Sequence, residues 1–403
     1  MIYILILFLL LFLSFKFDYL GQKRNKELWF VLIGVLLVCL AGFRYRIGVD
    51  SIRYETKYGL VPILSNLTYD DIFDSSLKAE PLFVLLFSAA KTISDDFWVL
   101  QMLQSILVIA IFWRFIKKNT QYWFISAFLF TLILYLHFTC EILRESCAVS
   151  MFLLGWEFYK EKKWIKYYIS VICAICFHSG AVFLLVIPIL DLLRIPKIIE
   201  KGPLAIGMLI ITLIGFGIWI QSNFEDYFIQ LLAFSSSLSD KADSYSDGRL
   251  AGQILNLNGL IITIINDVAY PIMAIFIIKK KNICHPSIKT MLFLALVISI
   301  LQIPVALLYR FCNYFLPFVI IALSEAIFTG NKKKVNQKTV LKKDYASCIM
   351  ILVPYIVIQL YSYRAQVGNT RYRMYEIYTP YTSIFDKSES PERNAIYRYY
   401  GAE

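Results

Sequence analysis

Apolar residues follow one another in long runs along most of this chain, and polar residues gather between the runs. A run of about 20 apolar residues forms a helix long enough to cross a bilayer. Shorter runs re-enter the membrane or pack inside the protein. The pattern predicts an all-α polytopic membrane protein with about 10–12 transmembrane or re-entrant helices. The runs lie at residues 2–15, 28–43, 81–93, 97–116, 122–138, 140–159, 167–190, 203–221, 254–278, 290–309, 311–328 and 345–362.

The composition agrees with this fold class. Of the 403 residues, 59% are hydrophobic and only 17% are charged, which leaves too little polar surface for a soluble protein of this size. The net charge of +11 is therefore interpreted as a topology signal rather than as a nucleic-acid footprint. No basic region precedes the apolar residues 1–13, so we expect a retained first helix rather than a cleaved signal. Cys173 and Cys176 have no second pair nearby and are expected to pack as small apolar side chains.

Lysine and arginine cluster in five short connectors, and such clusters favour the cytoplasmic side of a membrane. With all five inside, the loop 44–80, the loop 222–253 and the tail 363–403 lie outside. We expect one membrane domain that spans residues 1–403. The connectors are Lys16–Lys26, Lys117–Lys118, Lys160–Lys166, Lys279–Lys281 and Lys332–Lys343.

This orientation has a consequence for two apolar segments, 81–93 and 167–190. Each must then return to the side on which it began, as a re-entrant, broken or in-plane helix. The second contains Phe177-His178-Ser179-Gly180, a candidate break point that would line a cavity. Alternatively both segments cross fully, which would invert the middle of the protein and place Lys117–Lys118 and the Lys160–Lys166 cluster outside.

Charged residues recur on the expected outer side, most clearly where the second apolar run ends in Phe43-Arg44-Tyr45-Arg46-Ile47-Gly48-Val49-Asp50. Guanidinium groups bind phosphate oxygens bidentately, so converging arginines indicate a phosphate-bearing ligand, either an anionic lipid headgroup or a lipid-linked pyrophosphate. Each residue also has a structural interpretation: interface ion pairs, a packed histidine, a turn, or a snorkelling anchor. No metal-binding motif is present, and no metal or cofactor is predicted. The further candidates are Glu141 and Arg144, which are three residues apart and are expected on neighbouring helical positions, His178, Asp247-Gly248-Arg249, Arg310 and the tail arginines.

Several short motifs occur in an order that resembles the EpsG family, the Wzy-type polymerases of bacterial exopolysaccharide, capsule and O-antigen. The departures are Ser51 after Asp50, and Glu145 and Ser146 after Arg144. The motifs are Arg44 to Asp50 followed by Tyr54, Glu80-Pro81-Leu82-Phe83, Arg144 with Ala148, Phe177-His178-Ser179-Gly180-Ala181, Arg310-Phe311-Cys312-Asn313-Tyr314-Phe315 and Tyr378-Thr379-Pro380-Tyr381.

The resemblance implies a GT-C-like, metal-independent glycosyltransferase of the bacterial cytoplasmic (inner) membrane. Its site would face the outside or periplasm and polymerise undecaprenyl-pyrophosphate-linked oligosaccharide repeat units. The implied partners are that lipid-linked substrate, the bilayer and a chain-length regulator protein, with no nucleic acid. His178 is the first candidate base and Asp50 the second, while Arg144 would stabilise the leaving pyrophosphate. The expected substrate-binding residues are Arg44, Arg46, Tyr54, Glu141, Arg249, Arg310 and Tyr381.

Three other functions remain open from the sequence. A lipid-linked oligosaccharide flippase would also need an arginine-lined cavity, but with regular spans and internal repetition. A membrane acyltransferase would need a histidine near its donor site. A non-enzymatic partner of a polysaccharide synthase would use the charged clusters as interface ion pairs.

Overall fold

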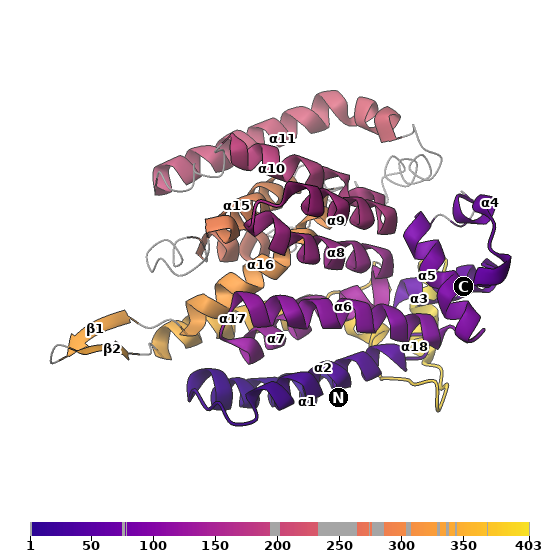
Figure 1. Ribbon diagram of the computed structural model, residues 1–403, viewed down its shortest axis with the longest axis horizontal. Coiled ribbons are helices and arrows are strands. Elements are labelled where there is room, and N and C mark those ends of the chain that lie inside the picture. Colours follow the sequence, from indigo (N-terminus) through magenta and orange to yellow (C-terminus); the bar gives the residue numbers. More distant parts are fainter. Residues whose placement is uncertain are drawn as a thin grey trace. The chain divides into compact units, whose positions relative to one another are not determined.

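The computed structural model shows a predominantly helical chain in which the helices follow the predicted apolar runs (Figure 1). It forms two compact units, each considered by itself: unit 1 comprises Met1–Val182 with Tyr345–Glu403, and unit 2 comprises Phe183–Asp344. The prediction of one membrane domain therefore stays a prediction. The structure describes residues 2–74, 77, 79–193, 202–232, 264–273, 275, 286–303, 308–328, 331–335, 338–342, 345–368 and 370–402.

Unit 1 contains the apolar helices and helix pieces from Ile2 to Phe177 and the last apolar helix before the tail. Helix α8 packs closely on α9, because a side chain at Gly155 would meet Ser170 at 2.8 Å. Helix α6 packs between α2 and α8. The bounds are α1 Ile2–Leu13 with η1 Ser14–Tyr19, α2 Lys26–Gly42, α5 Pro81–Ile93, α6 Trp98–Asn119, α7 Trp123–Phe130 with η4 Thr131–Tyr135 and η5 His137–Glu141, α8 Leu143–Lys160, α9 Trp164–Phe177, and α17 Tyr345–Ser362.

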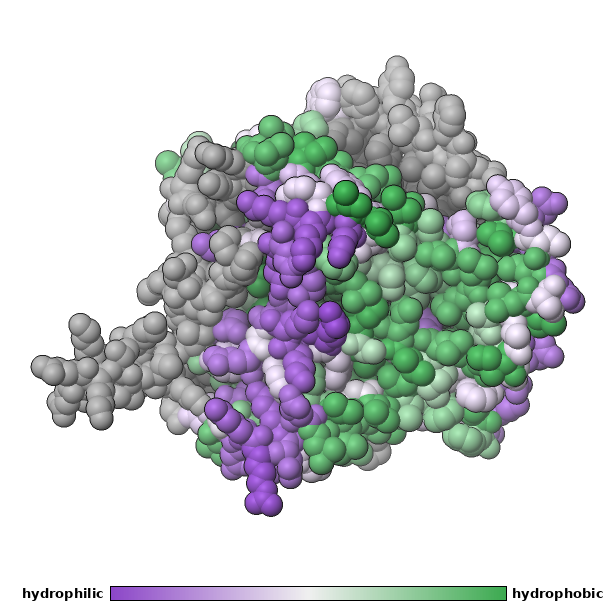
Figure 2. All heavy atoms as spheres, in the orientation of Figure 1, coloured by the Kyte–Doolittle hydropathy of each residue, from purple (hydrophilic) through white to green (hydrophobic). Residues whose placement is uncertain are grey.

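Exposed apolar side chains line the outward faces of these helices. On α1 and α2, Phe8, Phe12 and Val31 are more than half exposed. Figure 2 shows a broad apolar surface beside a band of hydrophilic residues on the face in view. Such a surface suits lipid rather than water. By length and composition, three described helices can cross a membrane: Ile2–Tyr19, Trp98–Asn119 and Tyr309–Phe328.

The predicted break in the segment 167–190 is present. Helix α9 ends at Phe177, and His178 has an extended backbone with φ −156° and ψ 116°. A 3₁₀ stretch, η6 Ser179–Val186, and the short α10 Ile187–Leu192 follow. Helix α5 is short, as predicted, and begins with Pro81 in its first turn. Whether these two segments cross or re-enter stays a prediction.

Unit 2 contains α11 Pro203–Leu232, η8 Ile264–Ala269, α15 Pro286–Leu301 and α16 Tyr309–Phe328. The prediction that a loop begins at residue 222 is wrong, because α11 continues to Leu232. Phe224, Phe228 and Leu231 recur at helical spacing, which explains the continuation. The rest of that loop lies outside the described residues, as does most of the run 254–278. The basic connector after α16 forms a hairpin of β1 Asn331–Val335 and β2 Lys338–Lys342.

The predicted outer loop and tail are partly helical and pack on each other. The loop contains α3 Val49–Leu60, η2 Leu64–Asn66 and α4 Tyr69–Ile72, and the tail contains η10 Met374–Ile377 and α18 Pro391–Tyr399. Tyr45 N donates to Thr382 O at 2.9 Å, and Ile384 N donates to Phe43 O at 2.9 Å. These bonds anchor the tail over the end of α2. We call residues 44–60 together with 378–402 the loop–tail cap; its C-terminal end lies beside α3 (Figure 1).

Candidate functional site

Glu80 and Arg144 form an ion pair between the starts of two helices. Glu80 precedes Pro81 with an extended backbone and thus begins α5, whereas Arg144 lies in the first turn of α8. Arg144 Nη1 donates to Glu80 Oε2 at 2.8 Å, and the two side chains are only 16% and 14% exposed. The buried Tyr54 of α3 is a further partner of Arg144. A charge pair with so little water around it is held by its partners rather than by solvent.

Residues at the broken end of α9 contact the other carboxylate oxygen of Glu80, Oε1. Ser179 donates to Glu80 Oε1 from both its backbone N, at 3.1 Å, and its Oγ, at 3.2 Å. His178 Nδ1 lies 3.4 Å from the same oxygen, and its Nε2 lies 3.9 Å from Glu145 Oε2. The His178 contacts are ion-pair approaches rather than well-formed hydrogen bonds. We call Glu80, Arg144, Glu145, His178 and Ser179 the Glu80 cluster.

The Glu80 carboxylate is strongly biased toward its charged form. Burial by itself would raise the pKa of Glu80, but the facing His178 ring, the Arg144 guanidinium and the Ser179 N–H hold it well below its usual range. A carboxylate fixed in this way stays negative and holds Arg144 in one place. The cluster is therefore a preorganised arrangement of one guanidinium, one imidazole and two carboxylates.

Glu141 and Arg144 do not lie on one continuous helix face. The helix that ends at Glu141 breaks at Ile142, which has φ −102° and ψ 54°, before α8 begins. The sequence-based placement of the two residues on neighbouring helical positions is therefore wrong. The break directs Glu141 to α3 and Arg144 to Glu80.

Glu141 caps the N-terminus of α3. Its two oxygens accept from Val49 N at 3.0 Å and Asp50 N at 3.2 Å, and Tyr378 OH donates to it at 3.1 Å. Gly48 makes this approach possible, because its φ of 103° and the nearby Cys140 O leave no room for a side chain. Burial and the Asp50 charge raise the pKa of Glu141 to about 7. Their effect outweighs that of the hydrogen bonds, which lower the pKa. Glu141 lies beyond the apolar helix Trp123–Tyr135 and is bound to the cap through Val49, Asp50 and Tyr378.

The arginines of the first motif occupy different environments. Arg44 is 1% exposed; its Nη1 donates to Ala41 O, while its Nε and Nη2 have no hydrogen-bond partner among the described residues. Arg46, with φ 46°, pairs with Glu55 at 3.2 Å and with Glu389 at 3.3 Å. One guanidinium is thus buried within the cap and the other lies at its surface.

The remaining sequence-predicted residues of unit 1 lie in or beside the cap. Asp50 is partly exposed and pairs with Arg53 at 3.2 Å. Tyr381 OH donates to Leu40 O at 3.1 Å, and its ring meets Tyr3 edge to face. Asp50 is thus in reach of solvent, whereas Tyr381 is bound to the end of α2.

Two other predicted residues belong elsewhere. Arg310 begins α16 in unit 2, where its Nε donates to Tyr309 OH at 3.1 Å. Arg249 lies outside the described residues. Within the described ranges, no three side chains of His, Cys, Asp or Glu are grouped to hold a metal ion.

Some residues of the site were not predicted from the sequence. Glu80 was visible through its Glu-Pro motif, although nothing in the sequence indicated Arg144 as its partner. Glu145 and Ser179 follow predicted residues directly. No sequence motif indicated Arg393, which is 2% exposed. It donates to Ile377 O at 2.9 Å and to Thr382 Oγ1 at 2.9 Å, and so holds the tail together.

These observations define an all-α membrane protein with a buried charge cluster beside an ordered loop–tail cap. The chain matches the EpsG family over residues 27–387 of 403 and belongs to that family. Membership indicates a polysaccharide-polymerase type of role at a lipid bilayer, on a lipid-linked substrate. No curated protein and no solved structure matches the chain.

Proposed function

We propose that the protein polymerises undecaprenyl-pyrophosphate-linked oligosaccharide repeat units at the outer face of the bacterial cytoplasmic membrane. The observation that carries this proposal is the Glu80 cluster, in which a partly exposed arginine, a histidine and two carboxylates meet at helix ends. Pyrophosphate is already a good leaving group. The site must therefore mainly stabilise the charge that develops on it and orient the acceptor hydroxyl.

Arg144 is the first candidate to bind the leaving pyrophosphate. Its guanidinium is held by Glu80 and Tyr54, and the 16% of the side chain that remains exposed is where a phosphate would bind. Arg46 is a surface candidate. Arg44 has two nitrogens without a partner among the described residues, and it becomes accessible only if the tail residues that bond to 43–45 move.

His178 is the candidate base that takes the proton of the acceptor hydroxyl as the glycosidic bond forms and the bond to pyrophosphate breaks. Glu80 lies 3.4 Å from Nδ1 and would fix the ring orientation, which leaves Nε2, 3.9 Å from Glu145, to accept the proton. Asp50 is the second candidate, since its carboxylate is partly exposed at the start of α3. In this mechanism Glu80 is a positioning residue, because it acts through Arg144 and His178.

The test uses purified protein with a synthetic undecaprenyl-pyrophosphate repeat unit and no nucleotide sugar, and the product is resolved on a glycan ladder gel. Wild type is compared with Arg144→Ala, His178→Ala and the matched control Arg371→Ala, an exposed tail arginine. We expect a ladder from wild type and the control, and loss of at least about 100-fold in rate for Arg144→Ala.

Three results would change the proposal. A ladder that persists in His178→Ala would transfer the base to Asp50. A ladder that persists in Arg144→Ala would remove the pyrophosphate role from the Glu80 cluster. No ladder from folded wild type, together with transfer of the lipid across proteoliposome membranes, would replace the polymerase with a flippase.

A further inference from the structure

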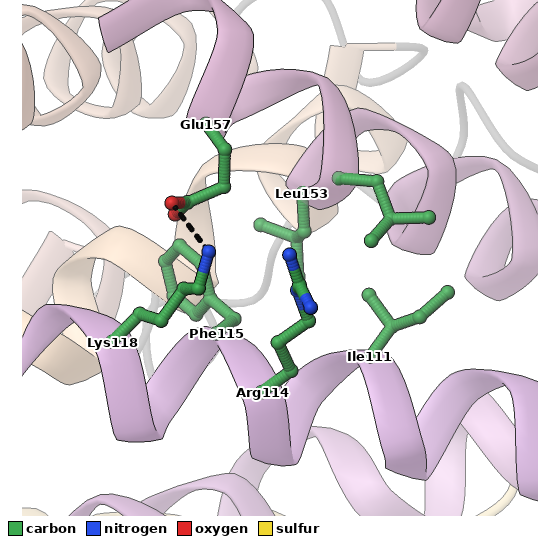
Figure 3. A pocket seen from close by; sticks show the side chains of 7 residues that line it. Ile111, Arg114, Phe115, Lys118, Leu153 and Glu157 are labelled. Carbon is green, nitrogen blue, oxygen red and sulfur yellow. Dashed lines mark hydrogen bonds and ion pairs between the residues drawn. The ribbon is translucent and has the colours of Figure 1, made fainter.

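A shallow hollow lies between α6 and α8, lined by none of the residues of the Glu80 cluster or the loop–tail cap (Figure 3). Its lining combines the apolar Ile111, Phe115, Leu153 and Leu154 with the charged Arg114, Lys118 and Glu157. Figure 3 shows Lys118 and Glu157 facing each other at one end, Arg114 beside Leu153, and Ile111 at the other end. Arg114 and Lys118 are one helical turn apart on α6 and therefore share a face. The hollow thus combines an apolar wall with a basic rim.

The rim of the hollow carries more positive than negative charges. Lys118 Nζ lies 3.1 Å from Glu157 Oε2, and Lys160 Nζ lies 3.0 Å from Glu157 Oε1. One carboxylate is thus shared by two lysines. Arg114 is exposed and has no ion pair or hydrogen bond within the part of the chain that the structure describes. The rim therefore carries an excess of positive charge that an anion can neutralise.

Neighbouring residues indicate that the hollow lies at a membrane–water boundary. Lysine ammonium groups lie over tryptophan rings here: Lys26 is 4.6 Å and Lys117 is 5.5 Å from the Trp123 ring centre. Lys160 lies 5.8 Å from the ring centre of Trp156, which is itself buried inside the protein. Tryptophan rings and basic side chains gather at the headgroup level of a bilayer. A lipid headgroup is therefore at the right depth to meet Arg114.

We propose that this hollow binds one anionic phospholipid, with the phosphate on Arg114 and Lys118 and an acyl chain along Ile111 and Leu154. A guanidinium binds phosphate oxygens bidentately, and the apolar wall lowers competition from water. Lipids with an ammonium headgroup also carry a phosphate, but their positive group would meet Lys118 and Lys160. The hollow therefore selects phosphatidylglycerol over phosphatidylcholine.

The experiment measures lipid binding to the full-length protein by native mass spectrometry, with phosphatidylglycerol and phosphatidylcholine in equal amounts. Arg114→Gln is compared with wild type and with Arg24→Gln, a matched loss of one exposed arginine in the loop before α2. We expect Arg114→Gln to weaken phosphatidylglycerol binding about fivefold, as for one basic residue near a lipid surface, and Arg24→Gln to have no effect. Inorganic phosphate at the same concentration should not compete, because it lacks the acyl chain.

Two results would overturn the proposal. Equal loss in both variants would show diffuse surface charge rather than a site, and unchanged selectivity in Arg114→Gln would remove Arg114 from it. Should Arg114→Gln fail to fold, Leu154→Trp provides a second test, because the larger ring fills the apolar end without changing charge. Wild-type phosphatidylglycerol binding in Leu154→Trp would then refute the site.

Discussion

The ion pair between Glu80 and Arg144 permits a quantitative test of the fold and the candidate site together. Its N–O distance is 2.8 Å, and both side chains are largely withdrawn from water. Removing one partner of such a pair leaves the other charge without compensation, which typically costs about 3–5 kcal/mol. Because Arg144 keeps Tyr54 and Glu80 keeps Ser179, we expect about 3 kcal/mol for Glu80→Gln and for Arg144→Met.

The double variant should cost clearly less than the sum of the two single variants. Once one charge is absent, the other is a buried ion without its partner. Deleting that ion removes an unfavourable charge and breaks no further ion pair. We expect a coupling energy of about 2 kcal/mol, whereas independent sites add within about 0.5 kcal/mol. The assay is unfolding of the purified protein in detergent, followed by tryptophan fluorescence for wild type, both single variants and the double variant.

A matched control comes from Lys163 and Glu161, whose charged atoms lie 2.6 Å apart but whose side chains are 54% and 55% exposed. Water and salt screen such a pair, so their cycle should be additive within error. Additive energies for Glu80 and Arg144 would refute the reasoning that burial makes this pair strong. Equal coupling in both pairs would show that distance alone sets the energy.

Two further predictions concern the loop–tail cap. Gly48→Ala places a Cβ 2.5 Å from Cys140 O at a φ of 103°, so we expect a loss of about 3 kcal/mol in unfolding free energy. Gly59→Ala is the control, because a Cβ there meets nothing within 4 Å; an equal loss would contradict the steric explanation. The pKa of Glu141 is raised to about 7, so its contribution to stability is fully present below the ordinary glutamate value and lost as the pH rises through 7. Melting temperatures measured from pH 4 to pH 8, roughly the range between the ordinary and the raised pKa, should fall with pH in wild type and not in Glu141→Gln. The same pH dependence in both proteins would contradict this prediction.

Much of the helical layout followed from the spacing of apolar residues alone. The runs that began at residues 81, 97 and 122 correspond to α5, α6 and α7, and the break expected at His178 is present. The boundary at residue 222 was wrong, because a helix can continue through a polar stretch whose apolar residues keep helical spacing. The hairpin after α16 was not predicted, since a lysine-rich connector shows no alternating apolar pattern.

The candidate site was only partly visible in the sequence. His178 and Arg144 were named because an ionisable residue beside an apolar run is costly and therefore conspicuous. Their partner Glu80 lies 64 residues before Arg144, and only the packing of α5 against α9 and of α6 against α8 brings these groups together. The break at Ile142 decided which partners Glu141 and Arg144 take. One non-helical residue changes the direction in which the side chains of the next helix point relative to those of the helix before it.

The sequence by itself determined the class of protein, the positions of most helices and the family. These depend on local quantities: the apolar length needed to cross a bilayer, and short motifs in order. The tertiary structure decided which charges meet, which arginine is buried under the tail and which remains open. Such contacts join segments far apart in the chain. They depend on how helices pack and where they break, which no local pattern specifies.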